Sequence, residues 1–364
     1  MLKLLAAAIA GISLAVLPSA AVQAQTLPQD EIIAAAEAAV EAGAPGAIVL
    51  VRSGGESLAV ARGLADRAEG VPMSADYLIR MASITKLYTA AVIVRLAQLE
   101  LVDLDAPVRQ YLPAEVLHRI ANADRATVRQ LLNHTSGIPD YYDWRSTLFW
   151  DWREPLTPER IFAHVRGKAA TGPAGAEYEY SNTNYHLLAL IAEAASGESL
   201  DALYRIHLFE PAGLEHTLYN GLFAERDLIH GYGSEFRRWR DTYDWQENTG
   251  PDGGMAAPAQ EIALFLEALF APGGALEAIG RDMLADPVEY EERKAYGLGV
   301  DILTTRSGDR LYGHTGSVWG YLSGAFYLPD RDTTMIVHIN RNDEAIFGNL
   351  VRNTGRAIMV PGGE

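Results

Sequence analysis

The stretch Met81-Ala82-Ser83-Ile84-Thr85-Lys86 leads directly into an apolar segment at residues 87–99 with helical spacing. Ser83 and Lys86 are three residues apart, so their side chains lie on one face of a helix that begins at or just before Ser83. A hydroxyl beside an amine pairs a nucleophile with its base. The stretch therefore predicts a long helix and a catalytic site at its first turn.

The plainer interpretation of Ser83 is a helix N-cap that satisfies an unpaired backbone N–H. Lys86 argues against it, because a capping box takes Glu or Gln three residues after the Ser. The positive end of the helix dipole also disfavours a cation there by about 0.3–1 kcal/mol. The same dipole lowers the proton affinity of an amine and favours negative charge on a nearby oxygen, and both effects help a Ser attack a carbonyl.

The first 24 residues have the pattern of an export signal. Lys3 supplies a positive start, residues 4–16 are apolar, and the small-residue site Val22-Gln23-Ala24 follows the breaker Pro18. We therefore expect cleavage after residue 24 and an exported protein, periplasmic or secreted, with residues 25–364 as one hydrolase-like domain. The alternative is an uncleaved membrane anchor. No later stretch is apolar over enough residues to span a bilayer.

The composition excludes several classes of protein. The chain has no Cys, so it has no disulfide, no thiolate nucleophile and no cysteine zinc site. Its formal net charge of −17 argues against nucleic acid or anionic lipid as a partner. A reactive side chain must therefore carry oxygen or nitrogen, and the expected partner is a small-molecule, peptide or ester substrate.

The order of the predicted elements indicates an α+β fold. A helix is predicted at residues 29–42 and a hairpin follows it at 47–61; later strands are predicted at 299–303, 311–314, 322–328 and 333–339, with a last helix at 346–358. Helical patterns dominate between them. We expect an antiparallel sheet flanked by helices and built from residues 25–85 and 290–364. A mostly helical lobe at 86–289 is inserted, with the active site between the two parts.

Two segments show no clear periodicity. Residues 138–152 look like a loop rich in aromatic rings, which either line a substrate cleft or, the interpretation we favour, pack a long connection. Residues 221–250 are polar, and their Arg237-Arg238-Trp239-Arg240 run is typical of a solvated face.

A second candidate motif is Tyr180-Ser181-Asn182, which stands just before an apolar helix predicted at 185–195. An irregular backbone there directs a phenol and a carboxamide into one cleft. By itself the triplet is equally typical of a turn in which Ser181 or Asn182 is an N-cap. The third motif, His314-Thr315-Gly316, stands at the end of a predicted strand, where a Gly is commonplace.

Taken in order, the three motifs resemble those of the penicillin-recognising serine hydrolases, the serine β-lactamase and penicillin-binding protein superfamily. Tyr in the second motif makes the chain similar to the class C β-lactamase branch, with its D-alanyl-D-alanine carboxypeptidase, D-aminopeptidase and esterase relatives. Further similar stretches lie at residues 131–141, 253–255 and 313–321. The resemblance extends from about residue 29 to the C-terminus.

The resemblance implies catalytic roles for three residues. Ser83 matches the nucleophile, and Lys86 matches the residue that takes or relays its proton. Tyr180 matches the second general base, which also protonates the leaving group. Such assistance is needed because an unassisted hydroxyl is a poor nucleophile, and a positioned base contributes about 10²–10⁴-fold.

The resemblance also implies a substrate-binding set. Asn182 matches the donor that holds the amide carbonyl of the substrate, and His314 and Thr315 match residues beside the substrate. The backbone N–H groups of Ser83 and Ser317 would form the oxyanion hole, which contributes about 2.7–4 kcal/mol per donor in comparable sites.

His314 departs from the pattern, because β-lactamases of this branch carry Lys at that position. His is charged only in part near neutral pH. We therefore expect an acyl-enzyme hydrolase of D-amino-acid peptides, of the D,D-carboxypeptidase or aminopeptidase type, or of esters. The alternatives are a class C-type β-lactamase and a penicillin-binding sensor that stays acylated.

Motifs of other hydrolases are absent from the sequence. There is no G-x-S-x-G nucleophile elbow, no H-E-x-x-H and no P-loop or G-x-G-x-x-G. We expect no cofactor and no metal, and the sequence leaves the oligomeric state open.

Overall fold

A computed structural model describes residues 27–220, 228–235, 238–244 and 250–359. The expected signal segment, residues 1–24, lies outside the described residues, as does Arg237. Within the described ranges, no helix is both long enough and apolar enough to cross a membrane.

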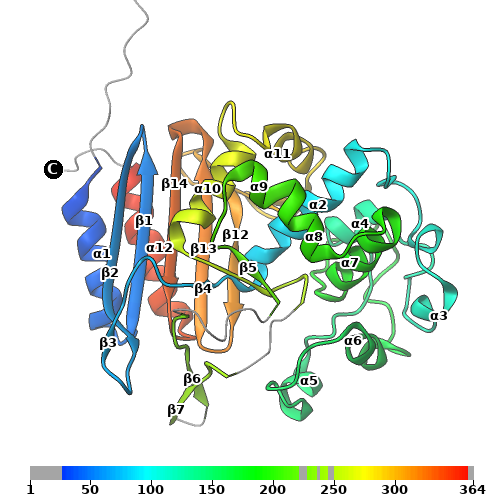
Figure 1. Cartoon of the computed structure of the whole chain (residues 1–364), viewed down its shortest axis with the longest axis horizontal. Coiled ribbons are helices and arrows are strands. Elements are labelled where there is room, and N and C mark those ends of the chain that lie inside the picture. Colours follow the sequence, from blue (N-terminus) through cyan, green and yellow to red (C-terminus); the bar gives the residue numbers. More distant parts are fainter. Residues whose placement is uncertain (1–26, 221–227, 236–237, 245–249, 360–364) are drawn as a thin grey trace, which may run out of the picture.

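The centre of the molecule is an antiparallel sheet of nine strands in the order β3-β2-β1-β14-β13-β12-β11-β10-β9 (Figure 1). The early chain supplies β1 (Gly46–Ser53), β2 (Glu56–Asp66) and β3 (Val71–Pro72). The late chain supplies β9 (Val288–Glu291), β10 (Lys294–Tyr296), β11 (Asp301–Thr304), β12 (Arg310–Val318), β13 (Tyr321–Leu328) and β14 (Thr333–Ile339). The two groups meet where β1 pairs with β14, with Val49 opposite Val337. The expected α+β class, with a sheet built from both ends of the chain, is confirmed.

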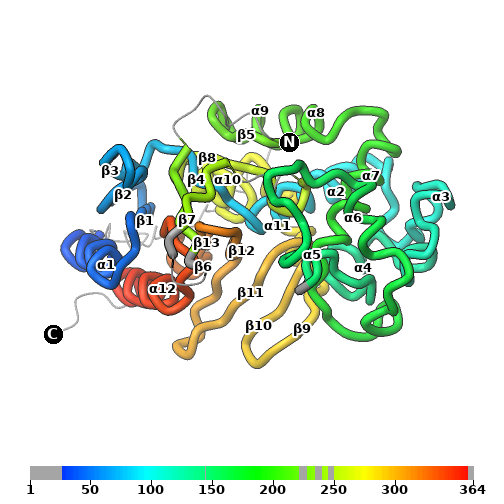
Figure 2. Tube along the Cα trace, turned by 90° about the horizontal axis from the view of Figure 1, so that it is seen from below, coloured from blue at the N-terminus to red at the C-terminus, as the bar shows by residue number. Residues whose placement is uncertain are grey.

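Helices cover both faces of the sheet. On one face α1 (Gln29–Glu41) and α12 (Glu344–Met359) lie side by side (Figure 2) and bury Ile32 and Phe347 against Val49 and Val337. On the other face α10 (Ala259–Phe270) packs on β13 and β14. Because β1 is covered on both sides, its residues 46–51 form an unbroken, buried apolar run. Each fully buried large apolar side chain contributes about 1.5–3 kcal/mol.

The helical part is organised around α2 (Thr85–Gln98), which is apolar on nearly all sides and buried along most of its length. It contacts α7 (Thr183–Ser196) and α11 (Glu277–Met283). The remaining helices of this part are α3 (Ala114–Leu117), α4 (Val128–Leu132), α5 (Trp144–Phe149), α6 (Pro158–Val165), α8 (Leu200–Tyr204), the π-helical turn η3 (Arg205–Phe209) and α9 (Glu210–Ala212).

A small second sheet ties the nucleophile segment to the helical part. Its order is β4-β8-β5, with β4 at Ile79–Arg80, β8 at Met255–Ala257 and β5 at Leu218–Tyr219. The Met81 N–H continues this contact by donating to the Met255 carbonyl at 2.9 Å. The chain just before Ser83 is therefore held beside residues 252–255.

Both segments without clear periodicity contain regular structure. Residues 138–152 include α5, whose N-cap Asp143 forms a capping box with Ser146. Tyr141 stacks on Trp150 at 5.9 Å between ring centroids, and Trp150 lies 5.5 Å from Trp152, so the packing interpretation is confirmed for these rings. Phe149, by contrast, is 75 % exposed.

The polar segment 221–250, in which the sequence showed no clear periodicity, contains two paired strands in its described part. β6 (Tyr232–Glu235) pairs with β7 (Arg238–Asp241) as a hairpin. The Tyr232 N–H reaches the carbonyls of Gly320 and Asn340, so the hairpin is anchored to the main sheet by contacts that local periodicity does not reveal. Arg240 is exposed, as expected for a solvated run.

Candidate active site

The turn just before α2 positions Ser83, the predicted nucleophile. Ala82–Ile84 form a 3-10 turn, and Ala82 has φ of +47°, a conformation that costs a non-glycine residue energy. The N-cap of α2 is Ile84, without a side-chain cap, so Ser83 does not serve as the N-cap. The plainer interpretation of this Ser is therefore wrong.

Lys86 lies directly beside Ser83. Its Nζ donates to Ser83 Oγ at 3.1 Å and to the Asp252 carbonyl at 2.7 Å. Burial lowers the pKa of Lys86 to about 8, although the negative charges of Asp252 and Asp140 oppose the shift. Near neutral pH a usable fraction of this amine is therefore unprotonated and able to accept the hydroxyl proton.

Tyr180 also contacts the Ser83 hydroxyl. Its phenol is a hydrogen-bond partner of Ser83, and its ring lies 5.1 Å from Lys86 Nζ. Burial raises the pKa of Tyr180 well above its usual value, so the phenol is protonated in this state. It is therefore a proton donor, while Lys86 is the group with an accessible basic form.

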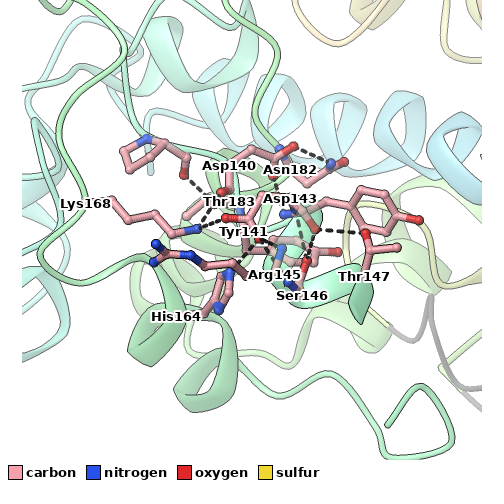
Figure 3. Close-up of polar contacts among 12 residues, drawn as sticks. Asp140, Tyr141, Asp143, Arg145, Ser146, Thr147, His164, Lys168, Asn182 and Thr183 are labelled. Atoms are coloured by element: carbon pink, nitrogen blue, oxygen red, sulfur yellow. Dashed lines mark hydrogen bonds and ion pairs between the residues drawn. The ribbon is translucent and has the colours of Figure 1, made fainter. Parts of the chain in front are cut away.

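Asn182 is held by a carboxylate that sequence reasoning did not select. Its Nδ2 donates to Asp140 Oδ2 at 2.9 Å, and its backbone N–H donates to Asp140 Oδ1 at 3.1 Å (Figure 3). Asn182 stands at the N-cap position of α7, as one of the two alternatives had it, but its side chain makes no capping hydrogen bond and bonds to Asp140 instead. Burial raises the pKa of Asp140 to about 6 against the opposing attraction of Lys86 and its hydrogen bonds.

Asp252 and His186 form a buried pair beneath Lys86 that was also missed. His186 Nε2 lies 2.9 Å from Asp252 Oδ1, and Tyr141 donates its hydroxyl to Asp252 Oδ2 at 2.7 Å. Burial raises the pKa of Asp252, but His186, Lys86 and the Tyr141 hydroxyl together lower it to about 2. This carboxylate is therefore a fixed negative charge that supports the position of Lys86.

His134 is a fourth residue that sequence reasoning left without a role. It has φ of +59° and is completely buried, with its ring 4.2 Å from the Tyr180 ring and 4.9 Å from the Tyr296 ring. Its Nδ1 accepts the Ser181 N–H at 3.1 Å, and burial holds its pKa well below the usual range. This neutral ring therefore supports the backbone beside Tyr180. The available signal was its place in the family-like stretch 131–141.

On β12 the third motif alternates between core and surface. His314 is buried, whereas Thr315 and Ser317 are exposed on the opposite face of the strand. His314 Nε2 lies 3.0 Å from the Tyr296 hydroxyl, and Nδ1 faces the Thr315 carbonyl. Since a carbonyl only accepts, Nδ1 carries the proton and Nε2 accepts from Tyr296. Burial lowers the pKa of His314, so the imidazole is neutral.

β12 lies against the turn that carries Ser83. A Cβ on Gly316 would stand 2.1 Å from the Met81 carbonyl oxygen, so only Gly permits this approach. The structure thus brings Ser83, Lys86 and Tyr180 into one hydrogen-bonded group, with the His314 ring 6.3 Å from that of Tyr180. The oxyanion role of the Ser83 and Ser317 backbone stays a prediction.

Among the described residues, one group of His and carboxylate side chains has the spacing of metal ligands, and it consists of Asp66, His230 and Asp241. His230 Nδ1 lies 2.7 Å from Asp241 Oδ2, and Nε2 lies 3.9 Å from Asp66 Oδ2. The imidazole thus faces one carboxylate with each nitrogen. None of the motif residues belongs to this group.

Comparisons with known proteins show which family the chain belongs to. The family model described as Beta-lactamase matches residues 30–352. Penicillin-binding protein 4* of Bacillus subtilis is 26 % identical over 315 residues, covering 82 % of this chain and 68 % of its own length. A D-aminopeptidase of Brucella anthropi is 26 % identical over 305 residues, covering 82 % of this chain. The chain spans only 56 % of the length of that enzyme.

Solved structures show the same fold. A D-stereospecific amidohydrolase from a Streptomyces species superimposes with a TM-score of 0.78 at 25 % identity, covering 92 % of this chain and 99 % of that one. The D-amino acid amidase from Ochrobactrum anthropi SV3, solved with L-phenylalanine, gives a TM-score of 0.79 at 23 % identity, covering 90 % and 98 %. Together with the matched family model, these findings place the chain in the beta-lactamase family, as one of its serine hydrolases.

Proposed function

We propose that this enzyme hydrolyses peptides, amides or esters of D-amino acids through an acyl-enzyme on Ser83. The observation that carries the proposal is the 3.1 Å contact between Lys86 Nζ and Ser83 Oγ, together with a Lys86 pKa of about 8. Nucleophilic catalysis needs a base in hydrogen-bond reach whose pKa is near the working pH. Lys86 meets both conditions.

In the proposed first half-reaction, neutral Lys86 takes the Ser83 proton as Oγ bonds to the carbonyl carbon of the substrate. The oxyanion is bound by the backbone N–H groups of Ser83 and Ser317, as the family resemblance implies. The Tyr180 phenol donates its proton to the leaving nitrogen or oxygen and is reprotonated from Lys86. In the second half-reaction, water attacks the acyl-enzyme carbonyl and gives a proton to neutral Lys86. The bond between the acyl carbon and Ser83 Oγ then breaks, Oγ takes the proton back from Lys86, and the free acid leaves.

The substrate class is inferred from the relatives and from His314 on β12, which forms the strand side of the site. The relatives include proteins named D-aminopeptidase and D-amino acid amidase. The neutral His314 supplies no cation to bind a substrate carboxylate of the kind that β-lactams and carboxypeptidase substrates carry. This favours aminopeptidase, amidase or esterase activity over carboxypeptidase or β-lactamase activity. Export to the periplasm or medium, through residues 1–24, belongs to the same proposal.

The test compares wild type and Ser83→Ala on a p-nitrophenyl ester, the p-nitroanilides of D- and L-phenylalanine, a fluorescent penicillin and a cephalosporin. We expect ester hydrolysis and preferential release from the D-anilide, both abolished by Ser83→Ala. Persistent penicillin labelling without turnover of the other probes would indicate a sensor. Fast cephalosporin hydrolysis without activity on D-peptides or esters would indicate a β-lactamase, and an active Ser83→Ala would show that the nucleophile is elsewhere.

A further inference from the structure

Asp140 is a carboxylate that the catalytic steps above do not use. It stands on the loop before α5, and both it and Asn182 are partly exposed, whereas their neighbours Tyr141, Ser181 and Thr183 are buried. Its negative charge acts on Lys86, which itself contacts Ser83. Asp140 is therefore near enough to act on Lys86, and as a residue it is partly exposed to solvent.

The contacts of Asp140 fix the orientation of the Asn182 carboxamide. An ionised carboxylate only accepts hydrogen bonds, so the NH₂ end of Asn182 faces Asp140 Oδ2, at 2.9 Å. The carbonyl end, Oδ1, then points away from Asp140, and no side chain among the described residues bonds to it. The pair thus presents a carboxylate and an amide oxygen, two acceptors, where the family resemblance implies a donor for a substrate carbonyl.

No protein cation neutralises the Asp140 carboxylate by a direct contact among the described residues. Lys86 Nζ is engaged by Ser83 and the Asp252 carbonyl. Lys168 Nζ lies 3.3 Å from the backbone carbonyl of Asp140 but pairs with the Asp143 carboxylate at 2.7 Å. In Figure 3 the Asn182 carboxamide meets the Asp140 carboxylate, whereas Lys168 and His164 reach the carboxylate of Asp143. The Asp140 carboxylate accepts from neutral N–H donors of Asn182 and Tyr142.

We propose that Asp140 and Asn182 together bind the protonated α-amine of the substrate, so that the enzyme selects D-amino acid derivatives with a free amine over N-acylated ones. This inference rests on the proposed function. The α-amine is attached to the carbon next to the scissile carbonyl, and the pair stands next to the residues that would attack that carbonyl. An N-acyl group would instead bring a carbonyl oxygen towards a carboxylate and an amide oxygen, which repel it.

The test compares D-phenylalanine p-nitroanilide with its N-acetyl derivative, in wild type and Asp140→Asn. The Asn side chain keeps the size of Asp140 and removes its charge. We expect wild type to prefer the free amine in kcat/KM, and Asp140→Asn to lose about 10- to 100-fold on the free amine with little change on the acetylated substrate. Asp140→Glu should restore part of the preference, because it restores the charge.

Asp143→Asn is the matched control, because it removes a carboxylate three residues away that pairs with Lys168 and His164. It should leave the ratio of the two kcat/KM values unchanged. The ratio should also fall above about pH 8, where the α-amine of the substrate loses its proton. Titration of Lys86 affects both substrates equally and cancels in the ratio.

Three results would overturn the inference. These are equal wild-type kcat/KM on the two anilides, an equal loss on both in Asp140→Asn, and no turnover of the free amine by an enzyme whose Ser83 is labelled by a fluorophosphonate. The proposed function fails differently, through absence of Ser83 labelling or retention of activity in Ser83→Ala. Thermal unfolding of each variant identifies any that does not fold, and in that case Asp140→Glu decides.

Discussion

The two sides of the active site differ in charge. On the helical side Lys86, Asp140, Asp252 and His186 are ionisable groups linked by hydrogen bonds or short-range attraction. On the strand side the motif residue His314 is buried and neutral. Its two ring nitrogens are hydrogen-bonded to the Tyr296 hydroxyl and to the Thr315 carbonyl. The comparison leads us to expect proton transfer on the helical side, and shape and backbone donors from the strand side.

The largest expected effect comes from removing the base on the helical side. Lys86→Met should lower kcat/KM on a p-nitrophenyl ester by about 10²–10⁴-fold, because Ser83 then has no group to accept its proton. His314→Gln, on the strand side, should lower it by less than about tenfold. Steady-state kinetics of both variants checks this. Equal losses in the two would show that the strand side also takes part in proton transfer.

The two sides should also differ in their contribution to stability. Asp252→Ala leaves the buried His186 and the Tyr141 hydroxyl without their partner, and should lower the free energy of unfolding by about 3–5 kcal/mol. Tyr296→Phe removes one hydrogen bond to His314 and should cost about 0.5–1.5 kcal/mol. Urea unfolding of both variants measures the difference. A milder effect of Asp252→Ala would mean that water replaces the lost carboxylate.

The pH dependence of the reaction should reflect the titration of Lys86 on the helical side and not that of His314 on the strand side. Lys86 acts as a base only when unprotonated, so kcat/KM on a neutral ester should rise about tenfold per pH unit below about pH 8 and level off above it. The pKa of His314 is lowered below its ordinary value of 6.5, so this residue adds no inflection between pH 7 and 9. A pH–rate profile from 6 to about 10 checks both statements. A rate that falls through pH 8 would contradict the role of Lys86.

The smallest expected effect comes from adding a positive charge on the strand side. His314→Lys places a cation where the neutral imidazole stands, and should speed acylation by a fluorescent penicillin about 2- to 5-fold, because the β-lactam carries a carboxylate. His314→Gln is the neutral control and should show no gain. The rate of label incorporation measures the effect. A gain in the Gln variant would assign it to space rather than to charge.

Much of the fold was predictable because its signals are local. Apolar spacing indicated the helix after Ser83 and the terminal helices, and β-rich runs indicated the strands that pair around β1 and β14. α5 was missed because its ring-rich sequence hides a short helix held by the Asp143 capping box. The β6–β7 hairpin was missed because contacts of Tyr232 with distant backbone anchor it.

The sequence by itself determined the pairing of Ser83 with Lys86, because three residues along a helix fix which side chains meet. Only the tertiary structure decided what surrounds that pair. Asp252 meets Lys86 across 166 residues, and Asp140 meets Asn182 across 42, distances along the chain that no local pattern encodes. It also decided the protonation of the site, because the pKa of Lys86 depends on burial and on neighbouring charges, which exist only once the chain has folded.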